Sequence, residues 1–176
     1  MRVICPHTRI HPETEAALQR YAPTAERIAV NPNDDTDYAR VLCAIWAAAE
    51  DTLIVEHDIE IHAKVVNAAR RCPEQWCVWP YNGPGWEDPN GDALIYESLG
   101  CTRFRASLMR AEPDLMTVAA AMSQGLAAGD WRRMDVSILP TLKARGYRPH
   151  RQSPPVLHHH VYNGRCACEQ VHEELT

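Results

Sequence analysis

The sequence lacks long apolar runs, an excess of positive charge and any C-x2-C cysteine pair. Its apolar stretches stay below the ~18 residues of a membrane-spanning helix, so we expect no membrane span. Lysine and arginine total 18 against 23 acidic residues, a net charge of −5. Because binding to a phosphate backbone relies on cationic side chains, we expect no nucleic acid partner. The opening MRVICPHTRI lacks the apolar core of a secretory leader, and we expect a cytoplasmic protein.

Length and composition are those of an ordinary globular domain. The chain has 176 residues, of which 45% are hydrophobic and 23% charged. A chain of this size can bury a core of its own without disulfides or metals as staples. We therefore expect a single domain over residues 1–162, followed by a polar tail over 163–176.

Seven cysteines are present, an odd number. The simplest interpretation is reduced thiols, several of them buried as small apolar side chains. The closest pairs are Cys72-x4-Cys77 and Cys166-x-Cys168, neither of which has the spacing of a zinc ribbon. A composite zinc site that combines cysteines with histidines is the alternative.

Short apolar runs alternate with amphipathic segments along the first 80 residues. The clearest helix starts at Tyr38 and ends near Glu50, where apolar residues recur at spacings of three and four. Leu53–Val55 is typical of a central strand that is buried on both faces. This order predicts an α/β fold with a mostly parallel central sheet flanked by helices. We expect the other strands at 3–5, 28–30, 76–79, 93–96, 102–106 and 156–160, the other helices at 12–21, 63–71, 113–122 and 131–144, and a loop rich in glycine and proline at 82–92.

Three acids follow the central strand at a spacing of two: Glu56, Asp58 and Glu60. If the extended conformation persists, their side chains project from one side of the chain. The carboxyl ends of parallel strands face the ligand crevice in such folds, and carboxylate oxygens suit Mg²⁺ or Mn²⁺. A solvated strand end with three exposed acids is the alternative.

Two further features carry chemistry late in the chain. On the strand expected at 156–160, His158 and His160 share one face and His159 takes the other, and a neutral imidazole is a good ligand for Mn²⁺ or Zn²⁺. Histidines on a surface strand without a ligand are the alternative. Asp135 lies early in the predicted helix 131–144, where an acid also favours the helix dipole.

In their order along the chain, these motifs resemble the GT-A-fold glycosyltransferases, most closely family 2 and related enzymes. Leu53-Ile54-Val55-Glu56-His57-Asp58 stands where these enzymes carry an acidic motif at the end of a central strand. Asp135 matches an acid near the start of a late helix. Gly146-Tyr147-Arg148-Pro149 and Pro155-Val156-Leu157-His158 match a later turn and a short strand that ends in histidine. The resemblance covers most of residues 1–160.

The resemblance implies transfer of a sugar from a nucleotide-diphosphate donor to the hydroxyl of an acceptor that the sequence does not identify. The donor would lie across the carboxyl ends of the first strands. Thr8 and Arg9, just after the first strand, would lie near the base or the diphosphate. Glu56 would contact hydroxyls of the ribose or the sugar.

The resemblance also implies a divalent metal and a general base. Asp58 and His158 would bind Mn²⁺ or Mg²⁺, with His160 as the competitor of His158. Given ~2.1 Å per bond, we expect a ring nitrogen of His158 to lie roughly 3–5 Å from an oxygen of Asp58. Asp135 would act as the general base on the acceptor hydroxyl if the configuration is inverted. Two other classes stay open: an inactive binding module of the same fold, and a zinc-binding protein that uses the histidines and cysteines.

Overall fold

A six-stranded sheet forms the centre of the protein in the computed structural model, which describes residues 1–34, 36–87, 93–96, 99–126, 133–159, 161–162 and 165–166. Its strands, in spatial order, are β2 (Glu26–Ala29), β1 (Arg2–His7), β3 (Thr52–Val55), β8 (Cys101–Phe104), β5 (Trp76–Val78) and β9 (His150–Arg151). The β2–β1, β1–β3 and β5–β9 pairs are parallel. Strand β8 runs antiparallel to both of its neighbours.

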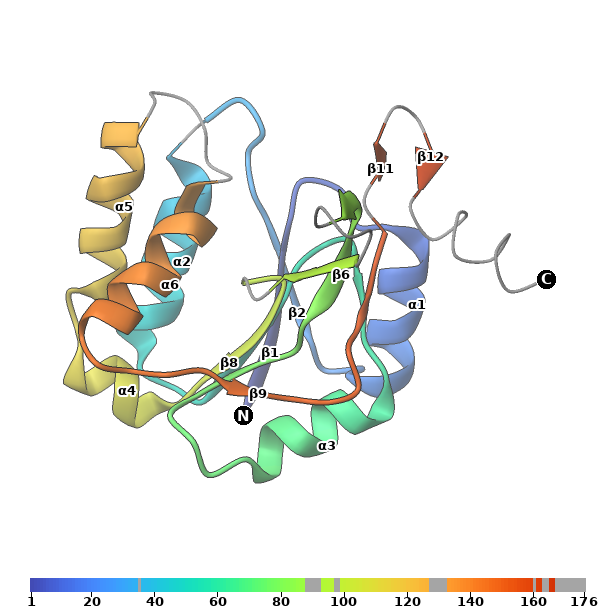
Figure 1. Ribbon diagram of the computed structural model, residues 1–176, viewed down its shortest axis with the longest axis horizontal. Coiled ribbons are helices and arrows are strands. Elements are labelled where there is room, and N and C mark those ends of the chain that lie inside the picture. Colours follow the sequence, from blue (N-terminus) through green and yellow to red (C-terminus); the bar gives the residue numbers. More distant parts are fainter. Residues whose placement is uncertain are drawn as a thin grey trace.

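Helices cover both faces of this sheet (Figure 1). They are α1 (Pro12–Tyr21), α2 (Asp37–Ala48), α3 (Ala63–Arg71), α4 (Ala106–Ala111), α5 (Leu115–Leu126) and α6 (Arg133–Ala144). Successive residues of a strand point to opposite faces of the sheet, so they pack into two separate hydrophobic cores. Ile54 packs with α2, α4, α5 and α6, whereas its neighbours Leu53 and Val55 pack with α1 and α3.

Several predicted elements are confirmed. The helices expected at 12–21 and 63–71 have those bounds, and α1 begins with a proline in its first turn. Helix α2 buries Tyr38, Leu42, Ile45 and Trp46, the face that its periodicity predicts. Gly146 stops α6 with a φ of +89°, a conformation that glycine adopts without steric cost.

Three predictions about elements need correction. Residues 81–87, assigned mostly to a loop, form strand β6 (Tyr81–Glu87), which pairs antiparallel with β7 (Ala93–Tyr96), while residues 88–92 lie outside the described part of the chain. The helix expected from residue 113 begins at Leu115, and the short α4 before it was not predicted. In the sheet, the order of elements could not reveal that β8 enters between β3 and β5.

Two small pairings complete the described part of the chain. Strand β4 (Ile59–Glu60) pairs antiparallel with β10 (Leu157–His158). Strand β10 lies within the strand expected at 156–160 and is shorter than it. Strand β11 (Val161–Tyr162) pairs with β12 (Arg165–Cys166), which lies beyond the expected domain end at residue 162. Within the described ranges, no helix has both the length and the apolar character that crossing a bilayer requires.

Candidate functional site

The carboxyl ends of β1 and β3 meet at one edge of the sheet because the two strands are parallel neighbours. Thr8 and Arg9 lie in an exposed bend directly after β1, and Glu56 follows β3 directly. The backbone N–H of His11 donates to the carbonyl of His57 over 2.8 Å, which ties the segment after β1 to the segment after β3. The residues predicted to flank a donor are therefore neighbours along this edge.

The extended conformation does not persist after β3, so the condition for three acids on one side is not met. The chain turns directly after Glu56, and the N–H of Ile59 donates to the Glu56 carbonyl over 3.1 Å. This turn interrupts the extended conformation on which the expectation depended. The turn sends Glu56, Asp58 and Glu60 to three different partners.

Asp58 faces His158, a residue one hundred positions further along the chain. Their Oδ2 and Nε2 atoms lie 3.1 Å apart, and 16% of the Asp58 side chain and 14% of the His158 side chain are exposed. The pairing of β10 with β4 sets this contact, because His158 stands opposite Ile59 in the register. The N–H of His159 also donates to the Asp58 carbonyl over 2.7 Å. The distance agrees with the 3–5 Å expected from the resemblance.

A second acid and histidine lie next to this pair. His159 Nε2 is 2.9 Å from Glu60 Oε2, and the His159 side chain is only 4% exposed. Its ring stacks on that of His11, with centroids 4.3 Å apart. His158, the last residue of β10, thus faces Asp58, whereas His159, the next residue, faces Glu60. His160, the competitor ligand, lies outside the described residues.

Glu56 receives a hydrogen bond from a buried tyrosine on α2. The Tyr38 hydroxyl donates to Glu56 Oε1 over 2.7 Å, and the Glu56 N–H donates to the carbonyl of Gly100 over 2.8 Å. Sequence reasoning placed Tyr38 on an apolar helix face and missed its hydroxyl. A buried tyrosine usually finds a polar partner, and that is the signal that would have indicated this contact.

Tyr81 and Gly100 were also missed. The Tyr81 ring lies beside that of His158, with centroids 4.8 Å apart, and Tyr81 is buried. A Cβ atom on Gly100 would lie 2.6 Å from Cε1 of Tyr81, so only glycine allows the ring this close to the backbone. No residue pattern in the sequence indicated either contact.

Two histidines at this edge, His7 and His11, have lowered pKa values. Burial lowers the pKa of His7, and the neighbouring His57 lowers it further. Burial and the nearby His159 likewise lower the pKa of His11. Both rings are therefore mainly neutral at pH 7, since even a free imidazole has a pKa near ~6.5.

The Asp58–His158 pair has the chemistry and the spacing of two metal ligands. A carboxylate oxygen and an imidazole nitrogen together suit Mn²⁺. Two ligands bonded at ~2.1–2.2 Å and at right angles lie about 3.0 Å from each other. The separation of 3.1 Å fits this arrangement, as it also fits a hydrogen bond between the two groups.

Asp135 lies in the first turn of α6, and its side chain is outside what the structure describes. In Figure 1, α6 begins at the end of the molecule toward which β1 runs from the N-terminus. Its role as a base therefore remains a prediction.

Comparisons with known proteins establish the fold and no closer kinship. Neither family models nor curated proteins gave a match. Among solved structures, a glycosyltransferase involved in the glycosylation of the major capsid of PBCV-1 is similar, with a TM-score of 0.53 and 11% identity over 98% of both chains. A197 from STIV is similar with a TM-score of 0.55 and 15% identity, over 94% of this chain and 88% of that one. The fold is thus shared with a glycosyltransferase, as the sequence resemblance led us to expect.

Proposed function

We propose that the protein is a metal-dependent glycosyltransferase that binds a nucleotide-diphosphate sugar at the carboxyl ends of β1 and β3. The observation that carries this proposal is the contact of 3.1 Å between Asp58 and His158, which brings two metal-ligating side chains together from distant parts of the chain. The likeness in fold to a solved glycosyltransferase supports the same class of activity.

The edge of the sheet supplies candidate contacts for the donor. Thr8 and Arg9 are exposed after β1, where a cation and a hydroxyl suit a diphosphate or a base. The Tyr38 hydroxyl orients the Glu56 carboxylate, whose oxygens accept hydrogen bonds from hydroxyls. In this proposal Glu56 binds the ribose or the sugar.

Asp58 and His158 are the protein ligands of the divalent cation, Mn²⁺ or Mg²⁺. Mn²⁺ is favoured because Mg²⁺ prefers oxygen ligands. When bound, such an ion offsets the negative charge that develops on a departing nucleoside diphosphate. Asp135 takes the proton of the acceptor hydroxyl as general base.

Calorimetric titration of UDP, GDP, ADP and CDP, with and without Mn²⁺, tests the binding step. We expect at least one of them to bind in a Mn²⁺-dependent manner, and Asp58→Asn or His158→Gln to weaken that binding by about tenfold or more. Glu60→Gln is the matched control, because its carboxylate faces His159 instead, and it should keep the Mn²⁺ dependence. Binding that ignores Mn²⁺, or that survives both ligand variants, contradicts the metal assignment.

Incubation with the corresponding nucleotide sugars then separates an enzyme from an inactive module. Release of the nucleoside diphosphate by hydrolysis or transfer supports the transferase. Tight Mn²⁺-dependent binding without any turnover, across donors and acceptors, would instead favour the inactive binding module.

A further inference from the structure

A second group of metal-ligating side chains lies away from the candidate donor site: Cys72, Cys77 and His150. Cys72 follows the last residue of α3, Cys77 lies in β5, and His150 lies in β9. Because β5 and β9 are parallel neighbours with Cys77 opposite His150, their side chains lie on the same face of the sheet. The sheet pairing itself therefore brings these two ligands together.

One ligand atom from each residue takes part, and these three atoms lie within 4.8 Å of one another. Cys72 Sγ is 3.2 Å from His150 Nδ1. Both cysteines are buried, whereas His150 is exposed and gives the group access to solvent. Three ligand atoms this close together can contact a single metal ion.

The structure joins Cys72 and Cys77 in a disulfide, which the sequence did not predict. Three other cysteines are free thiols, as expected: Cys5, Cys43 and Cys101. The Cα atoms of Cys72 and Cys77 are 7.4 Å apart, beyond the usual ~4.4–6.8 Å of disulfide-bonded pairs. Two thiolates that converge on a metal ion are free of this limit, since the ion lies between the sulfurs. The backbone therefore suits a bridged pair at least as well as a direct bond.

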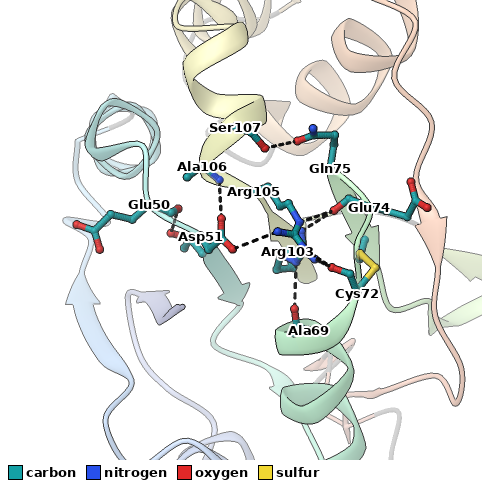
Figure 2. A network of polar contacts seen from close by, with 12 residues as sticks. Glu50, Asp51, Ala69, Cys72, Glu74, Gln75, Arg103, Arg105, Ala106 and Ser107 are labelled. Carbon is teal, nitrogen blue, oxygen red and sulfur yellow. Dashed lines mark hydrogen bonds and ion pairs between the residues drawn. A yellow bond between two sulfur atoms is a disulfide. The ribbon is translucent and has the colours of Figure 1, made fainter.

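Two arginines hold the Cys72 end of the group (Figure 2). The guanidinium groups of Arg103 and Arg105 both donate to the Cys72 carbonyl. These contacts fix the backbone at Cys72, the first of the three candidate ligands.

We propose that the reduced Cys72 and Cys77, together with His150, bind a zinc ion. Two thiolates and one imidazole are typical zinc ligands, and the fourth tetrahedral position is left to water. A thiol or phosphine reductant supplies the two electrons and solvent the two protons that convert the disulfide to thiols. Each thiol then gives its proton to solvent as its sulfur binds the metal.

The proposed ion would fasten β9 to the sheet. Strand β9 is only two residues long and lies at the sheet edge, so few ladder hydrogen bonds hold it. The ion would link it to β5 and to the end of α3. The site does not depend on the proposed transferase activity, because it shares no ligand with the Asp58–His158 pair.

Metal analysis of the untagged full-length protein tests the proposal. The protein is reduced with a phosphine, supplied with Zn²⁺, dialysed and measured by mass spectrometry of the metal. We expect about one zinc per chain, with loss of at least nine-tenths of it in Cys77→Ser. The control Cys43→Ser changes a free thiol on α2 and should keep the zinc, as should Asp58→Asn.

A second variant is needed because Cys77→Ser changes a buried residue and could lose zinc through misfolding alone. His150→Asn alters an exposed side chain and should weaken zinc binding by about tenfold or more, measured by competition with a chelating dye. Substitution with Co²⁺ should give sulfur-to-cobalt charge-transfer absorption in the wild-type protein and in Asp58→Asn. Reduced protein that holds no zinc, or zinc retained in both Cys77→Ser and His150→Asn, would overturn the proposal.

Discussion

Replacing Arg103 by methionine should destabilise the protein far more than the same change at Arg105. Arg103 is 1% exposed, and its guanidinium donates to the carbonyls of Ala69, Cys72 and Glu74 (Figure 2). These carbonyls belong to the last turn of α3 and the segment after it, where no further helical N–H groups follow. The side chain therefore caps the C-terminus of this helix from the neighbouring strand β8.

The expected cost follows from these three contacts. A hydrogen bond to a charged group contributes about 1.5–3 kcal/mol, and such contributions do not add fully when partners are shared. Arg105 still donates to the carbonyls of Cys72 and Glu74, and methionine avoids the desolvation of a buried charge. We therefore expect Arg103→Met to lower the free energy of unfolding by about 2–4 kcal/mol, or the melting temperature by about 4–16 °C for a chain of this size.

Urea unfolding followed by circular dichroism, with every sample in one reducing buffer, measures this difference. Arg105→Met is the matched control: its side chain is 32% exposed and its ion pair with Asp51 is long, at 4.0 Å. Its two carbonyl partners, at Cys72 and Glu74, still accept hydrogen bonds from Arg103 when Arg105 is replaced. Arg105→Met should therefore cost about 1 kcal/mol or less. Equal destabilisation by the two variants would refute the role of Arg103 as a buried helix cap.

Three further predictions concern the candidate donor site. In Gly100→Ala the new Cβ atom would lie 2.6 Å from Cε1 of Tyr81, so the ring must move. We expect a cost of about 1–3 kcal/mol in urea unfolding, and an unchanged midpoint would contradict the tight packing at this glycine. Because the pKa of His7 is lowered by burial and by His57, the unfolded chain binds more protons, so stability should fall as pH decreases below ~6.5. His7→Gln should flatten this dependence, and a slope identical to wild type would be inconsistent with it. Asp135→Asn should reduce sugar transfer by ~10²-fold or more without weakening donor binding, whereas normal turnover would reject it as the base.

Elements with strong local patterns could be predicted from the sequence. The proline at the start of α1 and the apolar spacing of α2 depend on residues within one helix, and both helices formed as expected. Leu53–Val55 is apolar throughout because both faces of its strand are buried. In these segments, local propensity and tertiary packing favour the same conformation.

What could not be predicted depends on contacts between distant segments. Strand β6 contains Gly83, Pro84 and Gly85, which favour a turn locally, yet it pairs with β7 at residues on either side of them, and the register is irregular between Asn82 and Glu87. The three acids after β3 contact three different partners because a turn forms there, and nothing in their spacing indicates this turn. The contact between Asp58 and His158 was expected from the resemblance to a family, because residue spacing alone cannot relate two positions so far apart.

The place of β8 in the sheet has a consequence for how the chain folds during its synthesis. Strands β3 and β5 leave the ribosome first, yet each hydrogen-bonds to β8 in the finished sheet, as the spatial order of the strands shows. Until residues 101–104 emerge, the inner edges of both strands have no partner, and unpaired edges of apolar strands invite association between chains. A nascent chain that stalls before β8 should therefore depend on chaperones, and completion of β8 should mark the step at which the two halves of the sheet join.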